Sequence, residues 1–261
     1  MDNVTIKLQG GLGNYLFQIA TAYSYGLLHD KNILFNVSEA IQIHRHITTY
    51  QENIFRKVNF VSSINYTNFN LYREPNFSYN AIPFIYGSVY LEGYFQSEKY
   101  FSEYEHKIKD LFYITEKLEE EIQNKYGEVL NQNTCSIHVR RGDYLNLSEH
   151  HPLCDIEYYK DAMEHMPNDT VYLVFSDDIS WCKENFLGDN YIFIEDNSDI
   201  FDLYLMSLCH NNIIANSSYS WWGAWLNNNK NKIVVSPKMW FGPAKVGLDT
   251  KDVHCKNWIK I

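Results

Sequence analysis

The sequence predicts an α/β protein with two domains, of which the second is built on a parallel β-sheet and the first is less regular. Three observations support this class. The 261 residues are 45% hydrophobic, which is enough for the core of one large domain or two small ones. Short apolar strands alternate with helices through the second half, as is typical of a parallel sheet covered on both faces. Residues 4–37 show one strand–helix–strand unit. We place the domains at residues 1–132 and 133–261.

The first half begins clearly and then shows a weaker pattern. Residues 41–90 hold short aromatic pieces separated by Pro75, Pro83 and Gly87, and we predict an irregular region there. The last helix of this half is polar and charged, and it precedes the predicted domain junction. The predicted elements are strands at 4–9 and 33–37, a Gly-rich turn at 10–14, and helices at 15–28, 97–112 and 114–126.

The second half alternates regularly between strands and helices. Apolar runs predict strands at 135–139, 171–176, 191–196, 212–216 and 232–237. Helical periodicity predicts helices at 155–166, 179–186, 199–210 and 220–228. This order of elements is typical of a Rossmann-like domain, whose ligands bind at the carboxyl ends of the strands.

Charge and composition argue against several classes of protein. There are 22 Lys and Arg against 32 Asp and Glu, and the net charge of -10 argues against a nucleic-acid surface. The amino terminus has no basic segment followed by an apolar one, and no long apolar run follows, so we expect a cytoplasmic protein. Five widely spaced cysteines without a C-x-x-C pair indicate reduced thiols. The cluster of His150, His151 and Cys154 is more typical of a loop than of a metal site.

Four polar motifs directly follow predicted strands. They are GGLGN at 10–14, RRGDY at 140–144, SDD at 176–178 and NSSYS at 216–220. Because the carboxyl ends of parallel strands lie at one edge of a sheet, motifs in this position converge. The chain has only five arginines, and Arg140 and Arg141 stand together at a strand end. A surface ion pair with nearby carboxylates is the alternative interpretation for either arginine.

The Gly-rich turn does not match a dinucleotide-binding motif. Leu16 stands where G-x-G-x-x-G needs its third glycine, and no acidic residue ends the next strand. The glycines would still let the backbone pass close to a ligand. Asn14 would either cap the following helix or point into a cleft. A simple strand-to-helix turn with a cap explains the motif equally well.

Three serines precede the apolar helix that begins near residue 220. Hydroxyls and free N–H groups at a helix amino terminus favour an anion such as phosphate, although an ordinary capping segment has the same composition. Asp177 would accept hydrogen bonds from a base or a ribose, or would cap the helix at 179–186. The tryptophans of the 220–228 helix fit a core better than a sugar-stacking surface. Two arginine forks and a serine-rich helix start together indicate a nucleotide-diphosphate site without a metal.

Four segments together resemble the α-1,2-fucosyltransferases of glycosyltransferase family 11, namely GGLGNYLFQIA, HVRRGDY, FSDDISWCKENF and NSSYSWWGAWL. They occur in the family's order. Tyr15 and Ile19 depart from the family's usual Gln and Tyr, which bears on acceptor choice more than on reaction type. The resemblance implies a GT-B fold, in which two Rossmann-like domains with parallel sheets face each other across a cleft and the second domain holds GDP-fucose.

The resemblance also implies the reaction and the roles of the motif residues. The reaction is inverting, metal-independent transfer of L-fucose from GDP-fucose to the 2-hydroxyl of a galactose-type acceptor, without a cofactor. Arg140 would hold the β-phosphate, and Arg141 would support the loop or reach the phosphates. The serines would hold phosphate oxygens, while His138 and Asp177 would contact guanosine. The predicted donor contacts are Gly11, Gly13, His138, Arg140, Arg141, Ser176, Asp177, Ser217, Ser218, Tyr219 and Ser220.

The predicted catalytic residues are Arg140, Asp143 and Asn14. Inversion in one displacement needs a group that takes the acceptor proton, and Asp143 is the first candidate. Asn14 would orient the hydroxyl, and an Asp143 that only supports an arginine is an equal alternative. We expect no metal ligands. We expect an oligosaccharide acceptor that contacts residues 41–130, and a lipid-linked acceptor would bring the protein to a membrane surface.

Two other functions fit part of the sequence. Another inverting GT-B transferase with a different donor sugar or linkage would share the same motifs. A non-catalytic carbohydrate-binding protein would explain the 21 tyrosines and 6 tryptophans but not the phosphate-type motifs. A panel of donors tests the first alternative, and donor hydrolysis tests the second.

Overall fold

The computed structural model describes residues 1–42 and 45–261, which form two compact units. Unit 1 comprises Met1–Thr115 and Leu248–Cys255, and unit 2 comprises Glu116–Gly247 and Lys256–Ile261. Relative to the predicted domains 1–132 and 133–261, the polar helix after residue 115 lies in unit 2 and a short carboxy-terminal segment lies in unit 1. Asp252 holds that segment, because its buried carboxylate accepts hydrogen bonds from the Tyr79 N–H (3.0 Å) and the Lys99 ammonium (2.5 Å).

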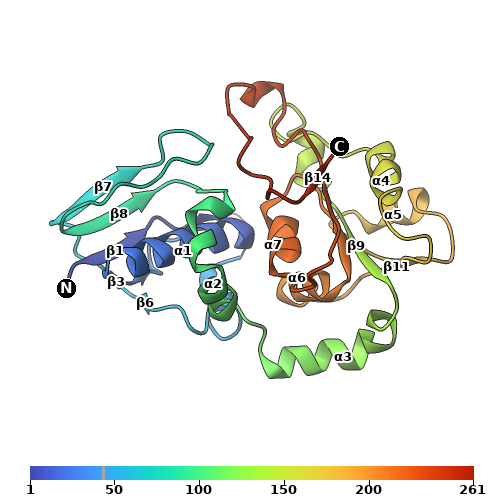
Figure 1. Ribbon diagram of the computed structural model, residues 1–261, viewed down its shortest axis with the longest axis horizontal. Helices are drawn as coiled ribbons and strands as arrows, with labels where there is room; N and C mark the ends of the chain where they lie inside the picture. Colours follow the sequence, from blue (N-terminus) through green and yellow to red (C-terminus); the bar gives the residue numbers. More distant parts are fainter. Residues whose placement is uncertain (43–44) are drawn as a thin grey trace. The chain divides into compact units, whose positions relative to one another are not determined.

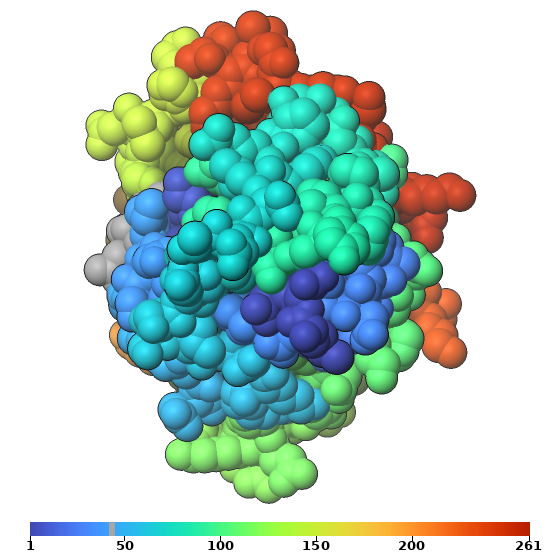
Figure 2. Space-filling model, turned by 90° about the vertical axis from the view of Figure 1, so that its left-hand side faces the viewer, coloured from blue at the N-terminus to red at the C-terminus, as the bar shows by residue number. Residues whose placement is uncertain are grey.

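Unit 1 is built on a parallel sheet of four strands in the order β3-β1-β8-β7 (Figure 1). Two short parallel pairs, β2 with β5 and β4 with β6, accompany this sheet. In Figure 2 the residues from β7 to β8, coloured cyan to teal, form a continuous surface beside the dark blue amino terminus. The elements are β1 (Asn3–Ile6), β2 (Gln9–Gly10), α1 (Leu12–Leu28), β3 (Asn32–Ile33), β4 (Phe35–Asn36), β5 (Ile41–Gln42), β6 (Phe60–Val61), β7 (Phe69–Arg73), β8 (Ser88–Glu92) and α2 (Glu105–Leu111).

The prediction of an irregular region at 41–90 was wrong for β7 and β8, and the two-residue strands β5 and β6 also lie in this region. Residues 43 and 44 of the predicted region lie outside the described residues. Strands β7 and β8 pair in parallel over five positions, from Phe69↔Ser88 to Arg73↔Glu92. No residue of β7 is fully covered, so its sequence lacks the apolar pattern of a buried strand. Its pairing with β8 fixes its conformation instead. The helix predicted at 97–112 is also shorter, since only α2 is α-helical and two 3-10 turns precede it.

Helix α1 forms the core of unit 1. Most of its residues are buried, and Tyr15, Phe17 and Ile19 are completely so. Burying a large apolar side chain contributes roughly 1.5–3 kcal/mol relative to leaving it exposed. This packing fixes the amino terminus of α1, and with it the Gly-rich turn that precedes the helix.

Unit 2 contains a six-stranded parallel sheet in the order β11-β10-β9-β12-β13-β14. Numbered from β9, this is the 3-2-1-4-5-6 order of Rossmann-type sheets. Every residue of the inner strand β9 is buried. The elements are α3 (Glu116–Leu130), β9 (Thr134–Val139), α4 (Ile156–Met163), β10 (Val171–Ser176), α5 (Ile179–Asn185), β11 (Tyr191–Phe193), α6 (Asp199–Leu208), β12 (Asn211–Ile213), α7 (Ser218–Leu226), β13 (Val234–Ser236) and β14 (Ile259–Lys260).

The helices of unit 2 cover both faces of this sheet, as predicted. Helices α4 and α5 lie on one face and α6 and α7 on the other (Figure 1). Helix α3 packs on α6 through Tyr126 and Phe201, whose ring centres are 5.9 Å apart. Within residues 1–42 and 45–261, no helix is long and apolar enough to cross a membrane.

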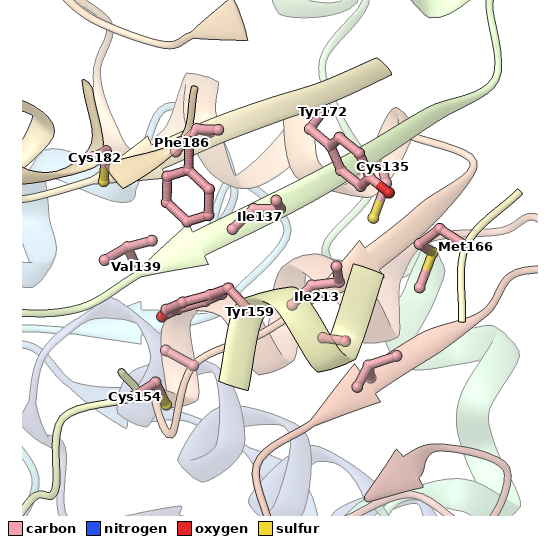
Figure 3. Packing of buried hydrophobic residues seen from close by; sticks show 14 residues of the cluster. Cys135, Ile137, Val139, Cys154, Tyr159, Met166, Tyr172, Cys182, Phe186 and Ile213 are labelled. Atoms are coloured by element: carbon pink, nitrogen blue, oxygen red, sulfur yellow. The ribbon is translucent and has the colours of Figure 1, made fainter. Parts of the chain in front are cut away.

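The core beneath α4 and α5 joins aliphatic strand residues to aromatic helix residues. Ile137 and Val139 of β9 are completely buried in one cluster with Tyr159 and Phe186 (Figure 3). The Tyr159 hydroxyl donates a hydrogen bond to the carbonyl of His138 (3.1 Å). All five cysteines are buried, and none of them forms a disulfide with another. This packing leaves the carboxyl end of β9 in a fixed position.

Candidate functional site

The strand order of unit 2 reverses beside β9, which has β10 on one side and β12 on the other. In sheets of this type, ligands bind in the crevice at the carboxyl ends of the strands where the order reverses. Three predicted motifs follow strands here: RRGDY after β9, SDD at the end of β10 and NSSYS after β12. Contacts join them, from the Arg141 N–H to Asp177 (2.9 Å) and from the Tyr144 hydroxyl to the Asn216 carbonyl (3.3 Å). The fourth motif, GGLGN, belongs to unit 1.

Arg140 pairs with carboxylates from two of these loops. Its Nη1 lies 2.7 Å from Asp177 Oδ2, and its Nη2 contacts Asp143. The guanidinium carbon lies 5.3 Å from the centre of the Tyr144 ring, and the side chain is 22% exposed. Asp143 thus supports Arg140, as the alternative interpretation of Asp143 proposed. The pairing also gives the guanidinium a fixed orientation at the strand end.

Arg141 contacts a different set of partners on α5. Its Nε donates to Asp178 Oδ2 (3.0 Å), and its guanidinium carbon lies 4.3 Å from the Trp181 ring centre. Asp178 also caps α5, since its carboxylate accepts the Trp181 N–H (3.2 Å). The N-cap of α5 is therefore Asp178 and not Asp177. Arg141 ties the loop to α5, and Asp177 is left to contact Arg140.

Gly142 lets the loops after β9 and β10 approach each other. A Cβ atom at this position would collide with the Asp177 carboxylate, so a side chain would separate Asp177 from Arg140. The Ser176 hydroxyl accepts the Asp178 N–H (2.9 Å) and shapes the turn after β10. Within unit 2, Ser176 therefore acts on the backbone of this turn.

Helix α7 begins with the predicted serines. Ser217 is the N-cap, and its hydroxyl accepts the Tyr219 N–H (3.4 Å), while Ser218 is the first helical residue. Ser220 is completely buried and donates to the Ser217 carbonyl (3.4 Å). Tyr219 donates its hydroxyl proton to the Asp199 carbonyl on α6 (2.6 Å). The capping interpretation is confirmed, and the positive end of the helix dipole lies at the reversal point. The tryptophans of α7 are buried in the core, as predicted.

His138 is buried in β9, two residues before Arg140. Burial, with a smaller effect of Arg140, lowers the pKa of His138 to about 3, so the imidazole is neutral at pH 7. The ring centre lies 5.5 Å from that of Tyr219. In the part of the chain that the structure describes, Nδ1 is buried and makes no hydrogen bond. Buried polar atoms usually have a partner, and a bound ligand would supply one.

In unit 1 the Gly-rich turn forms the amino terminus of α1. Gly11 is the N-cap residue, and Gly13 is buried in the first turn. Asn14 does not cap the helix, because it is a helical residue whose Oδ1 accepts a hydrogen bond from Gln96 Nε2 (2.7 Å). Gly10 has a φ of +98°, and a Cβ there would collide with the Asn14 amide. Gln96 was not among the predicted site residues, although a polar residue soon after the strand-like run at 88–92 was a usable signal.

The described residues contain no group of three His, Cys, Asp or Glu side chains arranged to hold a metal ion. The cluster of His150, His151 and Cys154 lies outside helices and strands, as predicted. His151 stacks on Tyr144 with 4.7 Å between ring centres, and the Cys154 thiol donates to Asn216 Oδ1 (3.8 Å). His151 and Cys154 therefore support Tyr144 of the RRGDY motif and Asn216 of the NSSYS motif.

Comparison with known proteins gives a family match along the chain. The model of the family described as glycosyl transferase family 11 matches residues 2–261. An α-1,2-colitosyltransferase of Escherichia coli is 31% identical over 100% of this chain and 99% of the relative. The O-antigen biosynthesis glycosyltransferase WbnK of the same species is 31% identical over 97% and 99%. The human galactoside α-(1,2)-fucosyltransferase 1 is 27% identical over 52% of this chain and 42% of the relative.

Solved structures share the fold at low sequence identity. Fucosyltransferase NodZ from Bradyrhizobium superposes with a TM-score of 0.59 at 11% identity, over 85% of this chain and 91% of that one. A family 9 glycosyl transferase from Veillonella parvula gives a TM-score of 0.52 at 9% identity, over 100% and 86%. The α/β fold with parallel sheets is thus that of GT-B enzymes. Because the family match spans nearly the whole chain and a relative aligns from end to end, this protein belongs to glycosyltransferase family 11.

Proposed function

We propose that the protein transfers L-fucose from GDP-fucose to the 2-hydroxyl of a galactose-type acceptor, with inversion and without a metal ion. Family membership makes it a glycosyltransferase, and the donor, acceptor and linkage are the proposal. One observation carries it: Arg140 and the amino terminus of α7 lie at the same reversal point of the sheet. Both favour anionic oxygens, and a departing nucleoside diphosphate has such oxygens.

In this proposal Arg140 acts on the leaving group. Negative charge grows on the β-phosphate as the glycosidic bond breaks, and a guanidinium offers two parallel N–H donors to phosphate oxygens. The N–H groups at the start of α7 and the hydroxyls of Ser217 and Ser218 hold the remaining oxygens, whereas the completely buried Ser220 hydroxyl donates to the Ser217 carbonyl instead. Arg141 keeps the loop in place through Asp178. His138 and Asp177 meet the guanosine, and the backbone at Gly11 and Gly13 passes close to the donor.

The acceptor proton needs a destination, and Asp143 is the first candidate base. Its carboxylate is 44% exposed and contacts Arg140. A base within hydrogen-bond reach of the acceptor typically contributes about 10²- to 10⁴-fold to the rate. Asn14 has no basic group at neutral pH, and its role in the proposal is to orient the hydroxyl.

A second donor has specific support. The relative that aligns with the full chain is named an α-1,2-colitosyltransferase. Colitose is fucose without its 3-hydroxyl, so the two donors differ by one oxygen. A site that hydrogen-bonds this hydroxyl would reject the deoxy sugar by about 10⁴-fold or more, whereas an apolar site would discriminate by only about 10²-fold.

A panel of donors and acceptors tests the proposal. Purified protein is incubated with GDP-fucose, GDP-colitose or GDP-mannose and with lactose, N-acetyllactosamine, a type-1 chain or a lipid-linked galactoside, and product linkages are determined by NMR. An α-1,2-fucosylated product supports the first donor, and transfer from GDP-colitose alone assigns the second. An absence of transfer from both donors to every acceptor refutes the proposal. Use of the lipid-linked acceptor would also support work at a membrane surface.

A further inference from the structure

The segment that follows β8, residues 93–96, reaches the Gly-rich turn through one hydrogen bond. Gln96 Nε2 donates to Asn14 Oδ1 at 2.7 Å, and Gln96 is only 8% exposed. The nitrogen of the Asn14 amide, Nδ2, would collide with a Cβ atom at Gly10, so a side chain there would displace the amide. The absence of a side chain at Gly10 and the donor on Gln96 therefore fix the same amide in one orientation.

Glu74 holds the backbone of the 93–96 segment. Its Oε2 accepts the Tyr94 N–H (2.8 Å), and both carboxylate oxygens accept the Phe95 N–H (3.0 and 3.1 Å). Gly93 makes room for this contact, because a Cβ there would lie 2.5 Å from the Cβ of Glu74. Three hydrogen bonds to one carboxylate thus determine the path of the chain just before Gln96.

Phe95 shows that this path is imposed by its surroundings. Its φ is +52°, in the left-handed region that residues other than glycine seldom adopt. The side chain is completely buried and packs edge-on against Tyr100, with 5.1 Å between ring centres. Backbone strain of this kind persists where the fold over-determines it, and it is frequent at functional sites. Here it delivers the Gln96 amide to Asn14.

We propose that Gln96 is a positioning residue for sugar transfer, which fixes the Asn14 amide so that its N–H donors face the substrate. The inference rests on the proposed function, in which Asn14 meets the acceptor hydroxyl. An N–H donor binds a lone pair of the hydroxyl oxygen and leaves the hydroxyl proton free for a base. Asn14 then orients the acceptor, and a different group removes its proton.

Gln96→Met tests the hydrogen bond separately from packing, because Met keeps the length of the side chain and loses its N–H donor. We expect kcat to fall about 10- to 100-fold, since a misplaced orienting group costs up to this much. Gln96→Glu should lose a similar factor, because a carboxylate cannot donate to Asn14 Oδ1 and keeps the polarity of the site. Asn70→Ala is the matched control: the Asn70 Nδ2 donates to the Tyr86 carbonyl (2.9 Å) elsewhere in unit 1, and the kcat of this variant should stay near that of wild type.

The decisive comparison repeats Gln96→Met in an Asn14→Ala background. If Gln96 acts through Asn14, the second substitution should change kcat by less than about twofold there. An equal loss of kcat in both backgrounds overturns the inference. So does a folded Gln96→Met variant that retains more than half of the wild-type kcat.

Urea unfolding midpoints of wild type, Gln96→Met, Asn14→Ala and the double variant test the contact without any substrate. The Asn14–Gln96 bond predicts that the double variant loses less than the sum of the two single losses, because both remove one interaction. Additive midpoints overturn the inference whatever the activities are. A wild-type protein that transfers neither fucose nor colitose overturns the proposed function instead, so the two failures are distinguishable.

Discussion

Arg140→Lys separates the charge of this residue from its shape. In the structure the guanidinium uses two different nitrogens for two carboxylates, Nη1 for Asp177 and Nη2 for Asp143. A lysine ammonium keeps the positive charge but cannot make two parallel contacts to a phosphate. If Arg140 stabilises charge that develops on the β-phosphate, kcat should fall about 10²- to 10³-fold, or roughly 3–4 kcal/mol.

The same substitution should have a small effect on stability. Each partly exposed ion pair contributes about 0.2–1 kcal/mol, and lysine can keep one of the two. The contact with the Tyr144 ring adds about 0.5–1 kcal/mol. The expected loss is therefore about 1 kcal/mol, which lowers Tm by about 2–4 °C in a protein of this size. A rate effect larger than the stability effect identifies a role in the transition state.

Kinetics and thermal melts of two variants decide the matter. Arg141→Lys is the control, because Arg141 contacts Asp178 and Trp181 and has no direct leaving-group role in the proposal. It should lose similar stability but keep kcat within about tenfold of wild type. A folded Arg140→Lys variant with more than about a tenth of the wild-type kcat refutes the reasoning. Equal losses of kcat in the two variants would do the same.

Four further outcomes are expected. Transfer should survive excess EDTA, and activity that is lost on chelation and restored by Mg²⁺ or Mn²⁺ contradicts metal independence. GDP should raise Tm more than UDP or ADP does, and Asp177→Ala should shrink that preference; equal protection by all three nucleotides argues against a guanine contact. Asp143→Asn should lower kcat yet tighten GDP binding about two- to fivefold in calorimetry, whereas weaker binding would point to a purely structural Asp143. Burial raises the pKa of Glu74 from 4.5 to about 7, so the folded state holds a proton that the unfolded chain loses, and stability falls as pH rises through this window. Glu74→Gln should therefore gain stability relative to wild type between about pH 5 and pH 8, and a constant difference in urea midpoint refutes this. The midpoint of Glu74→Gln is compared with that of wild type at each pH, because both proteins share a second effect. Burial lowers the pKa of His138 to about 3 and that of His151 to about 4, so these two histidines make stability rise with pH.

The fold and motifs of unit 2 could be predicted because its signals are local. Strand β9 is buried at every position, and each polar motif begins at the end of its strand or within three residues of it. The rule that parallel strands end at one edge then brings Arg140, Asp177 and Ser217 to one region of the sheet. The partners within that region were not predictable, because Asp177 and Asp178 have the same chemistry and only the geometry assigns one to Arg140 and the other to the cap of α5.

Unit 1 was harder to predict because its decisive contacts join distant positions. Asn14 and Gln96 are 82 residues apart, and Asp252 meets Tyr79 across 173 residues. Periodicity and turn composition report only on neighbours along the chain. Strand β7 has no buried residue and depends on its pairing with β8, so its own sequence has no clear strand pattern. Contacts of this kind determine the surroundings of the Gly-rich turn.

The charges at the reversal point connect the roles of Arg140 and Asp143. Two arginines there face three aspartates, Asp143, Asp177 and Asp178, so a diphosphate competes with carboxylates for the same guanidinium. Asp143 is the more exposed partner of Arg140, at 44% against 26% for Asp177. Breaking the Arg140–Asp143 pair therefore leaves a better solvated carboxylate than breaking the Arg140–Asp177 pair would. Donor binding would thus free one carboxylate while the other keeps Arg140 in place. A carboxylate released by the donor is available as a base only when the donor is bound, which couples proton removal to the presence of the leaving group.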